Sequence, residues 1–130
     1  MSNGIVIVGA GQASAAVASK LRTLGYAGPV TMIGEEPAPP YQRPPLSKGY
    51  LLKEMELDRL YLRNAEFWSE NNVVLRLGQP VTAIDTAERT VTVGDGVIGY
   101  DHLVLTTGST PRRLPAAIGG DLGGVYTVRT

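Results

Sequence analysis

Residues 5–14 read IVIVGAGQAS, and this stretch decides the fold. Residues 5–8 form a continuous β-branched apolar run, which is typical of a parallel strand covered on both faces. Two glycines, Gly9 and Gly11, then interrupt the apolar run, and residues 12–24 carry four alanines together with larger apolar side chains at helical spacing. The stretch therefore predicts a strand, a tight turn and a helix in immediate succession.

The turn between this strand and this helix has the features of a phosphate-binding turn. Gly9 allows the tight bend, and Gly11 lets a pyrophosphate approach the main chain without meeting a side chain. The helix start, at Gln12 and Ala13, supplies unpaired N–H groups and the positive end of the helix dipole, which stabilise phosphate charge. Ser14 stands where the usual motif has a third glycine, which makes the motif less specific.

A second strand is expected over residues 30–33, after a Gly-Pro turn, and it ends at an acidic pair. Glu35 at this position can accept hydrogen bonds from both hydroxyls of a ribose, and Glu36 is the alternative. An anion there would repel a ribose 2′-phosphate, so NADP is disfavoured. FAD and NAD both remain possible ligands at this point.

Composition excludes several other classes of function. The chain has 130 residues and equal numbers of basic and acidic side chains, so we expect one domain and neither nucleic acid nor an anionic membrane as partner. The absence of cysteine excludes disulfide scaffolds and thiolate metal sites within this sequence. We expect no metal site. The first apolar run is far shorter than the about 20 residues of a membrane span and lacks a basic leader, which predicts a cytoplasmic protein.

The rest of the chain predicts a Rossmann-like α/β fold, in which a βαβ parallel sheet carries a small antiparallel β-meander. Residues 37–45 contain five prolines and predict a stiff, extended surface loop. The further elements expected are helices over 48–52 and 64–72, core strands over 73–77 and 103–106, and a meander over 81–84, 90–93 and 97–100. The loops after Val8, Ile33 and Thr106 should converge on one crevice, because ligands bind outside the carboxyl ends of parallel strands. There Thr107 and Gly108 would bring main chain close to a ligand.

Two further segments carry a family resemblance. Residues 41–50 read YQRPPLSKGY and residues 101–112 read DHLVLTTGSTPR. Together with the glycine turn they resemble the NADH-dependent, FAD-containing ferredoxin reductases of the putidaredoxin reductase and rubredoxin reductase type. The resemblance implies that residues 1–130 are the N-terminal part of an FAD-binding domain, with the NADH-binding domain and the C-terminal domain absent.

The resemblance also implies roles for individual residues. The residues that it places around FAD are Ala13 at the pyrophosphate, Glu35 at the adenosine ribose, Val81 at the adenine, Arg43, Pro44 and Lys48 toward the flavin, and Arg129 at the far end. No catalytic residue is assigned. A lysine held on the first turn after a proline-stiffened loop could stabilise negative charge on a reduced flavin.

The function implied is electron transfer from NADH through FAD to a ferredoxin-type iron-sulfur protein. We expect the isolated chain to be inactive in NADH oxidation, to retain FAD weakly, and to form a homo-oligomer or domain-swapped dimer. The alternatives are a stand-alone NAD-binding Rossmann module and a non-catalytic fragment that binds no dinucleotide.

Overall fold

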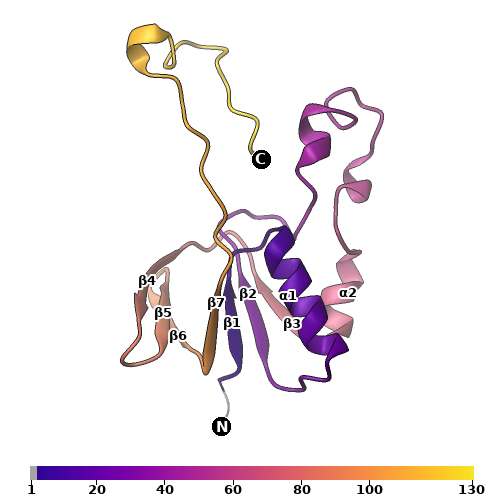
Figure 1. Cartoon of the computed structure of the whole chain (residues 1–130), viewed down its shortest axis with the longest axis vertical. Coiled ribbons are helices and arrows are strands. Elements are labelled where there is room, and N and C mark those ends of the chain that lie inside the picture. The colour runs from indigo at the N-terminus through magenta and orange to yellow at the C-terminus, as the bar shows by residue number, and fades with distance from the viewer. Residues whose placement is uncertain (1–2) are drawn as a thin grey trace.

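The computed structural model of the protein describes residues 3–130 and has three layers (Figure 1). A parallel sheet lies in the middle, helices cover one of its faces, and a small antiparallel sheet lies against the other. Two segments extend beyond the carboxyl ends of the central strands: the magenta arm around residues 44–60 and the yellow final segment. The predicted Rossmann-like fold with a meander is confirmed.

The central sheet has the strand order β3-β2-β1-β7, and all its neighbouring strands are parallel. Its strands are β1 (Ile5–Val8), β2 (Val30–Ile33), β3 (Val73–Arg76) and β7 (His102–Leu105). Every residue of β1 is buried, as its unbroken β-branched run predicts. In the register, Val8 lies beside Ile33 on one side and Leu105 on the other, so three strand ends are level.

The helical face consists of α1 (Gln12–Thr23) and α2 (Ala65–Glu70). Small side chains at Ala15 and Ala18 let α1 lie close to the sheet, and both are buried in the core. Helix α2 begins where Asn64 accepts a hydrogen bond from the Phe67 N–H at 2.9 Å. It buries Trp68, which is 2% exposed, against the same core, as expected of an apolar helix residue.

The opposite face is covered by the meander, which forms its own sheet in the order β4-β5-β6. Its strands are β4 (Val81–Asp85), β5 (Thr90–Val93) and β6 (Gly96–Gly99). Val91 and Val93 pack with Val6, Val8 and Ile33 in a second apolar cluster. The meander connects β3 at one edge of the central sheet to β7 at the other, and so covers a face that would otherwise be exposed.

Two predictions for the proline-rich region and the arm are wrong. Residues 48–52 form turns instead of a helix, and the regular elements of the arm are the 3₁₀ turns Pro44–Ser47 and Leu57–Arg59. The prolines account for this, because they begin a short turn that ends at Lys48, whose φ and ψ of −131° and −117° are not helical. Pro40, expected on the surface, is among the fully buried side chains.

The remaining differences are small. The other helices and strands lie within two residues of their predicted bounds, and a further 3₁₀ turn covers Ala116–Ile118. Within residues 3–130, no helix is long and apolar enough to cross a membrane, and no group of three acidic or histidine side chains could hold a metal ion.

Candidate functional site

The loops after β1, β2 and β7 meet at the carboxyl edge of the sheet. The Gly9 N–H donates to the Ile33 carbonyl at 2.7 Å, and the Val8 carbonyl accepts from both the N–H and the hydroxyl of Thr106, at 2.8 and 3.0 Å. A β-carbon on Gly34 would lie 2.6 Å from the Ala10 β-carbon, so the first two loops are in close contact. The structure therefore brings the three loops together at one edge of the sheet, as predicted, while the crevice between them stays a prediction.

Gly9 is required by both conformation and space. Its φ of +117° is one that side chains rarely allow, and a β-carbon would lie 2.2 Å from the Thr106 carbonyl oxygen. The turn can therefore pass beside the end of β7 only with glycine at this position.

Neither main-chain conformation nor lack of space requires glycine at position 11, in contrast to position 9. The φ of −106° at Gly11 suits any residue, and no atom of residues 3–130 lies within 4 Å of the position that a β-carbon would take. The side of the turn above Gly11 is therefore open.

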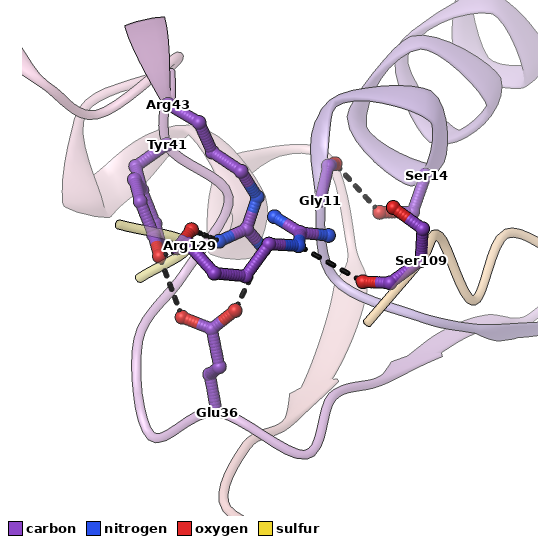
Figure 2. A network of polar contacts seen from close by, with 7 residues as sticks. All are labelled: Gly11, Ser14, Glu36, Tyr41, Arg43, Ser109 and Arg129. Carbon is purple, nitrogen blue, oxygen red and sulfur yellow. Dashed lines mark hydrogen bonds and ion pairs between the residues drawn. The ribbon is translucent and has the colours of Figure 1, made fainter. Parts of the chain in front are cut away.

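The start of α1 is open to solvent. No side chain within residues 3–130 caps the helix with a hydrogen bond, and Gln12 and Ala13 are exposed. Ser14 is fully buried and turns its hydroxyl back to the Gly11 carbonyl at 2.7 Å (Figure 2). Ser14, in place of the third glycine, therefore stabilises the glycine turn through its hydroxyl and leaves the N–H groups of the first turn of α1 available to an anion.

The two adjacent glutamates at the end of β2 differ in their surroundings. Glu35 is exposed and forms no ion pair within the described part of the chain. Glu36 is half-buried, and one of its carboxylate oxygens accepts from the Arg43 guanidinium at 2.7 Å while the other accepts from the Tyr41 hydroxyl at 2.7 Å. Glu35 thus remains the acidic group open to a ligand, and Glu36 is occupied by protein partners.

These contacts set the pKa values of the group. Burial by itself raises the pKa of Glu36. The hydrogen bonds from Arg43 and Tyr41 and the charges of Arg43 and Arg129 lower this pKa by more than burial raises it, so the pKa of Glu36 lies below its usual value. Burial, together with the hydrogen bond that Tyr41 donates to Glu36, raises the pKa of Tyr41 to about 12. Glu36 is therefore charged and Tyr41 neutral at pH 7.

Arg43 links this group to the final segment of the described chain. Its Nη1 donates to the Tyr41 hydroxyl at 2.8 Å and to the Arg129 carbonyl at 2.7 Å. Arg129 in turn donates from Nε to the Ser109 carbonyl at 2.9 Å, and Figure 2 shows its guanidinium between Arg43 and Gly11. A β-carbon on Gly108 would lie 3.1 Å from Arg129 Nη2, so Gly108 leaves room for this guanidinium.

The other residues predicted for the site stand in three places. Thr107 is exposed directly beyond β7, and Val81 is half-buried against the second apolar cluster. Pro44 and Lys48 lie on the arm, where Lys48 is exposed and its Nζ is 3.5 Å from the Pro44 carbonyl. The arm and the final segment border a hollow of about 610 Å³, lined by Leu46, Met55, Leu57 and residues 127, 128 and 130 among others.

Sequence reasoning missed Tyr41 as a member of this group. A signal for it does exist, since side chains two residues apart in an extended segment point the same way, as Tyr41 and Arg43 do here. The Arg43 guanidinium also lies over the Tyr41 ring, 4.9 Å from its centroid.

Comparison with known proteins identifies the family. Residues 3–130 match the family described as "pyridine nucleotide-disulphide oxidoreductase". The chain belongs to this family. Members of the pyridine nucleotide-disulphide oxidoreductase family bind FAD and use NAD(P)H. The present 130 residues contain no cysteine, so they hold no disulphide of their own.

Similar proteins of this family include several ferredoxin reductases. The chain is 44% identical over 127 residues to rhodocoxin reductase from Rhodococcus erythropolis and 40% identical over 119 residues to putidaredoxin reductase from Pseudomonas putida. These alignments cover 97% and 91% of the chain but only 30% and 28% of the relatives. The chain therefore spans less than a third of the length of these relatives.

The same likeness holds in three dimensions. The putidaredoxin reductase in a covalent complex with putidaredoxin superposes with a TM-score of 0.85 at 40% identity, over 92% of this chain and 29% of that one. The resemblance to ferredoxin reductases is thereby confirmed.

Proposed function

We propose that this chain binds FAD at the carboxyl ends of β1, β2 and β7. The open turn at Gly11 carries the proposal, because space lies free above an uncapped helix start that offers N–H groups to a diphosphate. The family membership and the likeness to ferredoxin reductases favour FAD over other dinucleotides.

The residues around the turn suit the parts of this ligand. The main chain at Gly9, Gly11, Gln12 and Ala13 would hold the pyrophosphate, and Glu35, exposed at the end of β2, would accept the hydroxyls of the adenosine ribose. Val81 would meet the adenine. Bound FAD would supply the exchange between two-electron and one-electron transfer.

The flavin half would lie between the arm and the final segment. Pro44 and Lys48 come from the arm, Arg129 from the final segment, and Thr107 and Gly108 from the loop between. The hollow of about 610 Å³ bordered by the arm and this segment has apolar side chains, which suits an aromatic ring system. Lys48 would balance negative charge on the ring.

A titration of the purified chain with FAD, followed by flavin fluorescence and repeated with NAD and NADP, tests the proposal. We expect FAD to bind in preference to NAD, and NADP to bind most weakly because its 2′-phosphate would meet Glu35. Selective binding of NAD would instead support a stand-alone NAD-binding module, and failure to bind any dinucleotide would support a non-binding fragment.

Substitution at Gly11 separates binding from folding. Gly11→Ala fits the unliganded turn, where nothing lies within 4 Å, but it places a methyl group where the pyrophosphate would lie. We expect FAD affinity to fall about tenfold or more with the unfolding free energy unchanged. Gly123→Ala is the control, since a β-carbon there also meets nothing within 4 Å. Equal FAD affinity in both variants would contradict the assignment of the turn.

We infer that, as part of a longer protein, the chain passes electrons from NADH through FAD to a ferredoxin-type iron-sulfur protein. The support is the likeness to rhodocoxin reductase and putidaredoxin reductase, of which the chain matches less than a third. The 130-residue chain loaded with FAD is therefore expected to show no appreciable NADH oxidation by absorbance at 340 nm. Turnover at the rate of an intact reductase would refute this division of labour.

We also propose that the isolated chain self-associates, as a homo-oligomer or a domain-swapped dimer. Leu105 at the exposed edge of β7 and Tyr126 in the final segment are 58% and 85% exposed, and such apolar surface favours association. Light scattering coupled to size-exclusion chromatography tests this, and a monomer at high protein concentration would contradict it.

A further inference from the structure

We propose that Glu36 is a positioning residue: together with the Tyr41 hydroxyl it holds Arg43, which fixes the main chain of Arg129 and keeps the Arg129 guanidinium against the Gly108–Ser109 loop, where it faces the Gly11 turn in Figure 2. This inference deepens the proposed function and rests on it for the identity of the ligand. It gives the two adjacent glutamates different tasks, because Glu35 is open to a ligand whereas Glu36 acts only through protein.

The first step is that Arg43 is committed to protein partners. Three of its five N–H groups are used: two at Nη1, for Tyr41 and Arg129, and one at Nη2, for Glu36. Its charge is balanced by the Glu36 carboxylate at 2.7 Å. Arg43 therefore links these segments through three N–H groups, and the other two stay available for the contact with the cofactor that the family resemblance implies.

The second step is that Arg129, unlike Arg43, keeps its Nη donors and its positive charge free of protein partners within residues 3–130. Its Nε binds the Ser109 carbonyl, while neither of its Nη atoms makes a hydrogen bond within residues 3–130. No carboxylate in the same range is paired with it. With Glu36 at −1 and two arginines at +1, the group carries one net positive charge, which Arg129 presents toward the glycine turn (Figure 2).

The third step is that the two residues that hold Arg43, namely Glu36 and Tyr41, are themselves fixed by main-chain contacts. The Glu36 carbonyl accepts from the Gly78 N–H at 2.9 Å just beyond β3. Tyr41 forms a β-bridge with Tyr61, and the flanking Gln42 N–H donates to the Leu60 carbonyl at 2.9 Å. Arg43 is thus held from fixed positions, whereas residues 121–128, which lead to Arg129, are exposed throughout. The network and the Ser109 carbonyl are what fix Arg129.

Measurement of main-chain order in the unliganded protein tests the positioning step without any cofactor. ¹⁵N relaxation should show that residues 125–130 are ordered in the wild type and lose order in Glu36→Gln, which keeps the shape of the side chain but removes its charge. Glu35→Gln is the matched control and should leave the segment unchanged. Unchanged order in Glu36→Gln would overturn the proposal.

A double-mutant cycle on FAD affinity tests the consequence for binding. Glu36→Gln should weaken FAD about tenfold in the wild type and have almost no effect in an Arg129→Gln background, because its effect passes through Arg129. Glu35→Gln should weaken FAD equally in both backgrounds. Fully additive effects of Glu36→Gln and Arg129→Gln would overturn the proposal. If the wild type binds no FAD while Glu36→Gln loosens residues 125–130, the network stands and the proposed cofactor is refuted.

Discussion

The glycine turn after β1 and the side-chain group at the end of β2 lie at the same edge of the sheet, yet they are built in different ways. The turn consists of main chain between a strand and a helix, and the side-chain hydrogen bond within it, from Ser14 to Gly11, spans three residues. The group joins Glu36, Tyr41 and Arg43 to Arg129, which lies 86 residues beyond Arg43. The residues of the turn are close neighbours in the sequence, whereas the group requires the arm and the final segment to be in place. We therefore expect the turn to be independent of pH and intolerant of added atoms at Gly9, and the group to respond to pH and to charge.

The largest expected effect concerns the turn. Gly9→Ala should lower the free energy of unfolding by about 3 kcal/mol or more, because it combines an unfavourable φ with a 2.2 Å approach to Thr106. Urea unfolding followed by circular dichroism measures this. Gly11→Ala is the control and should stay within about 0.5 kcal/mol of the wild type. If the two variants were equally stable, the distinction drawn between these glycines would fail.

A smaller effect is expected where β7 meets the turn. Thr106→Val removes the hydroxyl that donates to the Val8 carbonyl at 3.0 Å, while the Thr106 N–H still donates to the same oxygen. The expected loss is about 1 kcal/mol in urea unfolding. Thr107→Val, at the exposed neighbouring position, should change stability by less than about 0.5 kcal/mol. An equal loss in both variants would mean that the hydroxyl of Thr106 does not brace the turn.

The stability that the group of Glu36, Tyr41 and Arg43 contributes should decrease in acid. The pKa of Glu36 is lowered in the folded state, so its contribution to stability is present above the usual pKa of 4.5 and is lost as the pH falls through the lowered value. Wild type should be more stable than Glu36→Gln at pH 7, by less than about 1 kcal/mol for an ion pair about a third exposed. The difference should shrink as the pH is lowered below 4.5 in a series of urea titrations. A difference that grew in acid would contradict the network.

The smallest effect is spectroscopic. Of the six tyrosines, Tyr41 should ionise with a pKa of about 12. Because this pKa is raised above the ordinary value of 10, the corresponding stability is present below pH 10 and decreases as the pH rises toward 12. Absorbance at 295 nm, compared between the wild type and Tyr41→Phe, measures the difference. Loss of a tyrosine of ordinary pKa in the variant would show that Tyr41 does not donate to Glu36.

The sequence alone determined the parts of this protein that depend on local main-chain geometry. A strand covered on both faces, a tight turn and a closely packed helix each restrict the residue types over a few neighbouring positions. The apolar run of β1, the two glycines and the alanine-rich helix could therefore be recognised in the sequence. The same rules placed the second strand, the meander and β7. They failed for the arm, where prolines exclude regular structure without specifying what replaces it.

The tertiary structure decided which charged side chains meet. Adjacent residues in an extended segment point in opposite directions, so only the packing of the end of β2 settles that Glu36 and not Glu35 faces Tyr41 and Arg43. The position of Arg129 against the Gly108–Ser109 loop is likewise beyond any local pattern. Its contacts with Arg43 and Ser109 span 86 and 20 residues, and only the folded chain brings these segments together.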